Sequence, residues 1–168
     1  CGSNCGTSIV YFKKIFPNAV VIGYEADSYI FDYLKANIEK RNYKNVSIHN
    51  LAIWKEETQL EFFSEGSDGG RLTNKSFTPK IINKVETVTL SSILKNCEVD
   101  LLKIDIEGAE TEVLNECKES LGNVANIFIE YHSFQNSEQT LDVILKILKD
   151  SGFRYQIHEQ FSSPNPFT

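Results

Sequence analysis

Residues 101–118 (LLKIDIEGAETEVLNECK) pass from an apolar run through a polar turn into a helical pattern. The first four residues are typical of a short buried strand. Gly108 supplies a turn, and the apolar residues from about residue 109 to residue 118 recur at helical spacing. The stretch therefore predicts a strand that ends in acidic residues and is followed directly by a helix.

The same alternation of strand and helix extends in both directions from this stretch. A continuous apolar run at residues 20–24 (VVIGY) indicates a strand buried on both faces, as in a parallel sheet. The other expected strands are residues 46–49, 59–63, 85–90, 127–131 and 153–158, and the other expected helices are residues 6–16, 28–42, 91–95 and 137–150. This order predicts an α/β fold with a mainly parallel sheet.

Composition narrows the class of protein. The chain has 168 residues, 41% of them hydrophobic, which suits a single domain over residues 1–168. Its net charge is -6 and Lys and Arg never run beyond a pair, so nucleic acid is not expected as a partner. No apolar stretch approaches the roughly 18 residues of a membrane span, and the polar start does not resemble a signal peptide. We therefore expect a soluble, cytoplasmic protein whose four cysteines are reduced thiols.

Two features near the N-terminus are candidates for ligand binding, because ligands of open α/β sheets bind beyond the carboxyl ends of the strands. The loop of residues 1–6 (CGSNCG) opens the first helix, where glycines allow close backbone approach and free N–H groups are available. It lacks the G-x-G-x-x-G spacing of a dinucleotide site. Glu25 follows about 20 residues later, where an acid binds ribose hydroxyls in nucleotide-binding domains. The alternative interpretation of Glu25 is an exposed helix-capping acid.

A denser polar cluster follows two later strands. Asp105 and Glu107 come at or just past the end of the strand 101–104, while Glu130 and His132 flank the end of the strand 127–131. One interpretation is structural, with the acids favouring a helix dipole and His132 on the surface. The other is a functional site, because carboxylates crowded beside an apolar strand are costly unless they bind something.

At this point the sequence resembles a known family. Residues 99–114 (VDLLKIDIEGAETEVL) are similar to the hallmark segment of FkbM-type S-adenosylmethionine-dependent methyltransferases. The loop GSNCG resembles the D-x-G-A-N-x-G loop of that family, with Gly2, Asn4 and Gly6 matching and Ser3 in place of alanine. Three shorter segments also resemble the family, in the same order along the chain. Glu25 matches the acid of a family turn, although Ala26-Asp27 replace the residues that usually follow it. The other two segments are Asn50-Leu51-Ala52 and residues 127–132 (IFIEYH).

The resemblance implies a Rossmann-like methyltransferase fold, with helices on both faces of a mainly parallel sheet. It implies S-adenosylmethionine as cofactor and methyl transfer to a hydroxyl group of a sugar, glycolipid or natural-product acceptor. By position, Gly2, Ser3, Asn4 and Gly6 would hold the methionine end, Glu25 and Ala26 the ribose side, and Leu51 and Ala52 the adenine. Asp105 would lie beside the cofactor, and Asp105, Glu107 and His132 would meet the acceptor hydroxyl.

Methyl transfer needs alignment of the reacting atoms and removal of the hydroxyl proton. His132 is our first choice of base because the unperturbed pKa of histidine lies near neutrality, and Asp105 is the second. A divalent metal held by Asp105, Glu107 and Glu130 would lower the pKa of the acceptor instead. The spacing does not demand a metal, so none is included in the expected site.

Two other function classes stay open on the sequence alone. The first is a nucleotide-binding Rossmann-like module without methyltransferase activity, in which the acids are structural. The second is a degenerate domain that keeps the fold without the activity. Acceptor specificity would depend on the polar loop at residues 66–80 and on residues 161–168, which have no recognisable signature.

The chain contains no methionine at all. A glycine loop that opens a helix needs a buried strand before it, and no such strand precedes Cys1. We therefore expect this chain to be an N-terminally truncated piece of a longer protein that lacks the first strand of the sheet. The sheet should then show a gap or a displaced edge beside residues 20–24.

Overall fold

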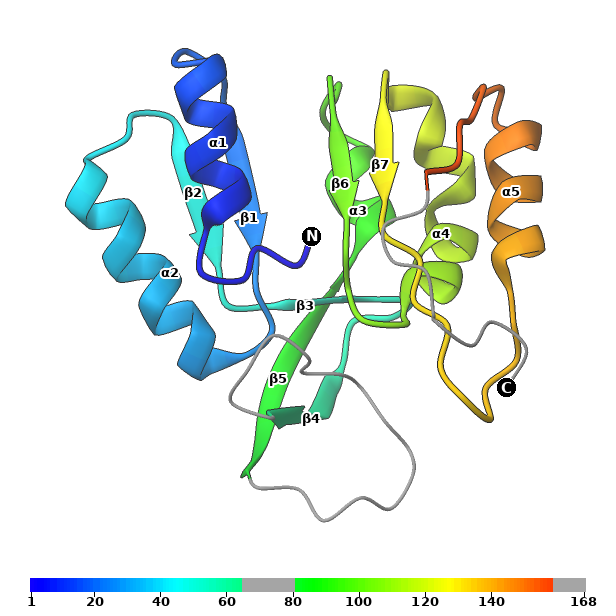
Figure 1. The fold of residues 1–168 in the computed structure, drawn as a ribbon, viewed down its shortest axis with the longest axis horizontal. Coiled ribbons are helices and arrows are strands. Elements are labelled where there is room, and N and C mark those ends of the chain that lie inside the picture. The colour runs from blue at the N-terminus through cyan, green and yellow to red at the C-terminus, as the bar shows by residue number, and fades with distance from the viewer. Residues whose placement is uncertain (65–80, 159–168) are drawn as a thin grey trace.

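The computed structural model describes residues 1–64 and 81–158 and has a mixed α/β architecture (Figure 1). The predictions for residues 66–80 and 161–168 lie outside the described residues. The helices are α1 (Thr7–Ile15), α2 (Ser28–Arg41), α3 (Leu90–Leu94), α4 (Glu110–Cys117), the 3-10 helix η1 (Lys118–Asn123) and α5 (Leu141–Asp150). The strands are β1 (Val21–Tyr24), β2 (Val46–His49), β3 (Ala52–Trp54), β4 (Gln59–Ser64), β5 (Ile81–Thr89), β6 (Leu102–Ile104) and β7 (Ile127–Ile129).

The described strands form three pieces of sheet. β1 pairs with β2 and β6 pairs with β7, both in parallel. In the third piece, β5 pairs with β3 in parallel and with β4 in antiparallel fashion. The predicted mainly parallel pairing is thus present, although the described strands do not join into one continuous sheet.

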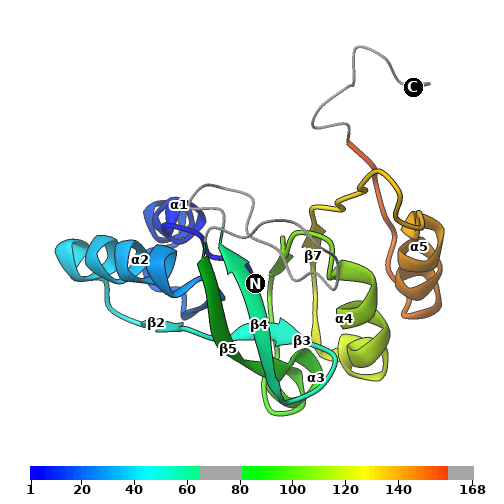
Figure 2. The ribbon, with the colours of Figure 1, turned by 90° about the horizontal axis from the view of Figure 1, so that it is seen from below.

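Local sequence explains why α1 and α2 pack against the first pair of strands. Asp27 caps α2 by accepting hydrogen bonds from the main-chain N–H groups of Tyr29 (2.9 Å) and Ile30 (3.4 Å). Leu34 and Ile38 then point inward and are buried with Ile9 of α1. This small core covers one face of the β1–β2 pair. Figure 2 shows α3 on the opposite side of the molecule from α1 and α2, beside β3.

The largest core lies around β6 and β7. It joins these strands to α3, α4, η1 and α5 through apolar side chains that are at most 9% exposed, namely Ile53, Leu90, Leu94, Leu102, Ile104, Val113, Leu114, Cys117, Leu121, Val124, Ile144, Ile147 and Leu148. The buried residues of α5 (Ile144, Ile147 and Leu148) lie at helical spacing, as expected for a helix in this segment. The core therefore fixes the ends of β6 and β7, where the acidic cluster begins.

Some sequence predictions were wrong in detail. Residues 153–158 form no strand, and the Tyr155 and Ile157 side chains that gave the alternating pattern are 49% and 62% exposed. The last long helix begins at Leu141 rather than at residue 137, and β3 was missed because three residues are too short to give a period. Among the described residues, no helix has the length and apolar character needed to cross a membrane.

Candidate functional site

The glycine loop folds back tightly against its own chain. Gly2 and Gly6 have positive φ angles of 71° and 92°, which residues with a side chain rarely adopt. A Cβ atom on Gly2 would lie 1.6 Å from the carbonyl oxygen of Asp105, and one on Gly6 would lie 2.7 Å from Leu34 Cδ1. The glycines therefore permit close packing within the protein, and Gly2 places the loop directly against the turn that follows β6.

The same loop lies between the β1–β2 pair and the β6–β7 pair (Figure 1). The main-chain N–H of Ser3 donates to the carbonyl oxygen of Tyr24 at the end of β1 (3.0 Å). The amino group of Cys1 donates to the carbonyl oxygen of Lys103 in β6 (2.8 Å). The Lys103 side chain donates to Asp105 (2.7 Å) and to the carbonyl oxygen of Gly2 (3.4 Å). The two bonds between Lys103 and the loop connect residues that are about a hundred positions apart in the chain.

Glu25 lies beside the loop, as its position in the sequence predicted. Its carboxylate accepts hydrogen bonds from the main-chain N–H groups of Asn4 (2.7 Å) and Asp27 (2.9 Å). Burial raises the pKa of Glu25, while the hydrogen bonds from Asp27 and Asn4 oppose that shift. Glu25 therefore fixes the shape of the loop, and its two oxygens keep lone pairs for further donors.

Asn50 is a supporting residue that we had assigned no role. Its side-chain amide donates to the carbonyl oxygens of Glu25 (2.8 Å) and Ala26 (3.2 Å), and its oxygen accepts from the Ser28 hydroxyl (2.9 Å). The sequence did contain a signal for this role. Asn50 follows β2 directly, and parallel strands end at the same edge of a sheet, so its amide could be expected near the end of β1. Asn50 holds the turn that presents Glu25.

Leu51 and Ala52 lie at the start of β3, close to that turn. Ala52 is only 4% exposed and packs with Val85 in a small core that also includes Ala26. Leu51 is half-buried. The structure thus places Ala26 and Ala52 in one apolar patch behind Glu25.

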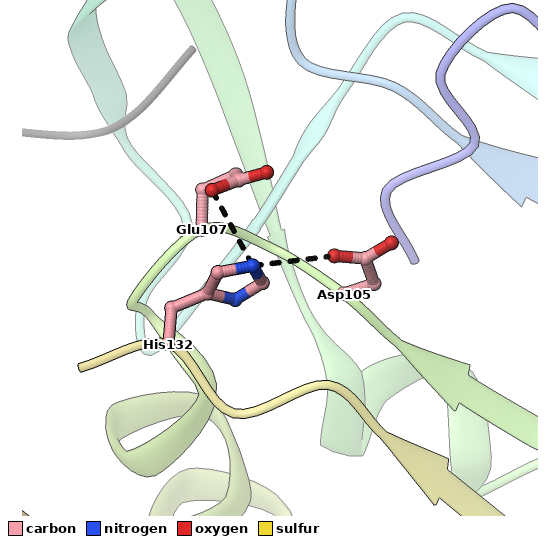
Figure 3. A group of neighbouring side chains, drawn as sticks. All are labelled: Asp105, Glu107 and His132. Carbon is pink, nitrogen blue, oxygen red and sulfur yellow. Dashed lines mark ion pairs between the residues drawn. The ribbon is translucent and has the colours of Figure 1, made fainter. Parts of the chain in front are cut away.

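The acidic cluster forms where β6 and β7 end. Asp105 and Glu107 follow β6, His132 follows β7, and the three side chains point toward one another (Figure 3). His132 Nε2 lies 3.5 Å from Glu107 Oε2, 3.8 Å from Glu130 Oε1 and 4.0 Å from Asp105 Oδ1. The predicted convergence of these four residues is present, and each side chain keeps between 20% and 28% of its exposure.

Glu110 belongs to the same cluster, although the sequence assigned it no role. Its side chain is 1% exposed, and Oε1 lies 3.1 Å from His132 Nδ1. The same oxygen accepts hydrogen bonds from the main-chain N–H groups of Ile106 (3.3 Å) and Gly108 (3.1 Å). The available signal was an acid in the first turn of a helix, where unpaired main-chain N–H groups gather.

These charges alter the expected chemistry of His132. The hydrogen bond with Glu110, and then the charges of Glu107, Glu110 and Asp105, raise the pKa of His132 to about 9 against the opposing effect of burial. Desolvation raises the pKa of Glu107, and the nearby His132 opposes this. Our reason for choosing His132 as base was therefore wrong, because its pKa does not stay near neutrality and the ring is protonated at pH 7.

The cluster also has the spacing of a cation site. Asp105, Glu107 and His132 each offer one ligand atom within 4.8 Å of the others. This compact group contains His132 in place of Glu130, which belonged to the alternative metal site considered from the sequence. Lys103 pairs with Asp105, and protonated His132 pairs with Glu107, so cationic side chains already balance much of this negative charge.

Comparison with known proteins gives the family of this chain. A family model described as the FkbM methyltransferase domain matches residues 1–155. The chain belongs to the FkbM methyltransferase family.

Two curated relatives of this FkbM-family chain are also named methyltransferases. "Methyltransferase 1" of Beauveria bassiana (strain ARSEF 2860) is 24% identical, and the match covers 67% of this chain and 55% of the relative. "Methyltransferase sdnD" of Sordaria araneosa is 22% identical, with 90% of this chain and 71% of the relative covered. The chain thus spans little more than half the length of the first relative. No solved structure gives a significant match.

Proposed function

We propose that this FkbM-family chain uses S-adenosylmethionine to methylate a hydroxyl group of a sugar, glycolipid or natural-product acceptor. The observation that supports this best is the direct packing of Gly2 against the carbonyl of Asp105. It joins the glycine loop and Glu25, which suit a nucleoside with an amino-acid tail, to the carboxylates and His132. One ligand can therefore reach from the loop to the acidic cluster.

The residues fit this cofactor chemically. Among the described residues, no side chain caps α1 by a hydrogen bond. The N–H groups in its first turn therefore suit the carboxylate of the methionine end, beside Gly2, Ser3, Asn4 and Gly6. Glu25 would accept the ribose hydroxyls. The apolar patch of Ala26 and Ala52, together with half-buried Leu51, would contact adenine. When bound, the cofactor supplies an electrophilic methyl group on a positively charged sulfur, and Asp105 and its neighbouring carboxylates would attract that charge.

His132 remains our first candidate for the base, under a stricter condition. Nε2 can accept the hydroxyl proton only when the ring is neutral. The neutral fraction rises as the pH approaches 9, and it also rises when further positive charge enters the cluster, since like charges lower the pKa. Asp105 is the second candidate, because Oδ1 faces His132 while Oδ2 pairs with Lys103. Glu107 would help to orient the acceptor.

Metal assistance is the competing route for activating the acceptor. A divalent ion would be held by Asp105, Glu107 and either His132 or Glu130. Its binding would have to break the ion pairs Lys103–Asp105 and His132–Glu107. Our proposal therefore predicts that EDTA leaves turnover unchanged. Loss of turnover with EDTA and recovery with Mg²⁺ would favour the metal route.

Calorimetry on the full-length protein tests the proposal directly. We expect binding of S-adenosylhomocysteine at micromolar concentration and no binding of NAD. The reverse result would favour a nucleotide-binding module without methyltransferase activity. Transfer of labelled methyl groups to a panel of simple glycosides and glycolipids then tests the acceptor class. Cofactor binding without transfer to any hydroxyl would contradict the proposed hydroxyl acceptor.

We also propose that a strand directly upstream of Cys1 completes a Rossmann-like sheet between β1 and β6 within a single domain. The hydrogen bonds from Ser3 to Tyr24 and from Cys1 to Lys103 support this, because they connect the facing edges of both strands. Among the described strands, β1 pairs with β2 alone and β6 with β7 alone. In a longer chain, slower hydrogen exchange at β1 and β6 amides would support the strand, and unchanged exchange would contradict it.

A further inference from the structure

Glu110 is the most deeply buried charged group of the cluster. Its carboxylate is 1% exposed, and a single oxygen contacts the main-chain nitrogens of Ile106 and Gly108 and the Nδ1 atom of His132. A buried carboxylate is costly unless its hydrogen bonds are made, and here all three partners belong to the candidate site. Its position thus links the turn after β6 to the segment after β7.

The first effect of this link is on the backbone beside Glu107. Glu107 has a φ angle of 56°, in the left-handed region that disfavours residues with a side chain. The N–H groups on both sides of it, those of Ile106 and Gly108, donate to Glu110. Gly108 itself has a φ angle of 98°, and a Cβ there would lie 2.6 Å from the Phe134 ring. Glu110 therefore stabilises the strained turn that presents Glu107.

The second effect is on the ring of His132. Nδ1 faces Glu110, and Phe134 stacks on the ring with a centroid distance of 6.3 Å. These two contacts leave Nε2 directed toward Glu107, Glu130 and Asp105. A carboxylate that binds one ring nitrogen fixes which nitrogen keeps its proton when the other is used.

We propose that Glu110 is a positioning residue, which holds His132 with a proton on Nδ1 and Nε2 open to the acceptor and fixes the turn that presents Glu107. This inference rests on the proposed function. It assigns Glu110 a role through two other residues and no contact with cofactor or acceptor. A purely structural Glu110, which only stabilises the start of α4, is the competing explanation.

NMR of histidine-labelled protein tests the inference without any acceptor. The chain has three histidines, and His132→Asn assigns the His132 signal. We expect a slowly exchanging Nδ1 proton on His132 in the unmodified chain. In Glu110→Gln, the amide oxygen still accepts but without charge, so this proton should exchange at least about tenfold faster. Glu112→Gln, on the exposed side of the same helix, is the matched control and should leave it unchanged.

Methyl transfer to a glycoside that the protein accepts gives the second readout. Glu110→Gln should lower kcat about 10- to 100-fold and leave S-adenosylhomocysteine binding within about twofold. In the His132→Asn background the same change should cost no more than about twofold, because the two residues act as one unit. Independent, additive losses would indicate a structural role and overturn the inference, as would an unchanged His132 signal. Failure of the proposed function would show separately, as absence of S-adenosylhomocysteine binding to the unmodified chain.

Discussion

The glycine loop and the acidic cluster lie in contact, yet they are stabilised in different ways. Main-chain hydrogen bonds and close packing hold the loop, with the Glu25 carboxylate accepting two main-chain N–H groups. Side-chain charges hold the cluster, where His132 lies among the carboxylates of Asp105, Glu107, Glu110 and Glu130. The loop should therefore respond to changes in steric volume and the cluster to changes in charge and pH.

The largest expected effect comes from adding one methyl group to the loop. In Gly2→Ala, the new Cβ would lie 1.6 Å from the Asp105 carbonyl oxygen at a φ angle of 71°, so loop and turn must separate. We expect no calorimetric binding of S-adenosylhomocysteine and a stability loss of several kcal/mol, on the order of the largest single-residue effects. Gly122→Ala is the matched control, because nothing lies within 4 Å of that position. Equal behaviour of the two variants would contradict the packing argument.

The next largest effect tests the cluster. His132→Asn removes the candidate base, so methyl transfer should fall about 10²- to 10⁴-fold, the usual contribution of general acid–base catalysis. Cofactor binding should stay nearly constant, because the hydrogen bond and ion pairs of His132 within the described residues go to the acidic cluster. His158→Gln, at an exposed position, serves as control. A rate within a factor of two or three of the unmodified chain would transfer the role of base to Asp105.

A smaller effect tests the ribose assignment. Glu25→Ala should weaken S-adenosylhomocysteine binding by about 1 to 3 kcal/mol, the loss expected when hydrogen bonds to a charged group disappear. Part of that loss comes from the loop, since the Asn4 and Asp27 N–H groups lose their acceptor. Glu25→Gln keeps an acceptor oxygen and should weaken S-adenosylhomocysteine binding less. Glu39→Gln, on the exposed side of α2, should leave binding unchanged. Unchanged dissociation constants in both Glu25 variants would refute the assignment.

How much of this comparison was predictable differs between the two regions. Strand and helix positions in residues 20–49 followed from apolar runs and helical spacing. The cofactor roles of the loop residues and Glu25 rest on the family resemblance and stay predictions. The need for glycine at position 2 could not be predicted in this way. The group that excludes a side chain there is a carbonyl about a hundred residues away in the sequence. The contact between Glu110 and His132 could not be predicted for the same physical reason. Glu110 appears in sequence as one acid of a helix start, and only folding brings it to His132, 22 residues later. The pattern at residues 153–158 misled because alternation alone does not supply a neighbouring strand.

The smallest expected effect is a dependence of stability on pH, between pH 6 and pH 9.5, that requires His132. The pKa of His132 is about 9 in the folded chain against 6.5 for an unperturbed histidine, so folding binds a proton more tightly. This stabilisation is fully present below pH 6.5 and is lost as the pH rises through 9. The Tm advantage of the unmodified chain over His132→Asn should therefore be larger at pH 6 than at pH 9.5. Each kcal/mol corresponds to about 2–4 °C in a chain of this length. Gly122→Ala should follow the unmodified chain at both pH values. An advantage that grew toward pH 9.5 would mean that the carboxylates around His132 do not hold its proton, and the charge-based half of the comparison would then fail.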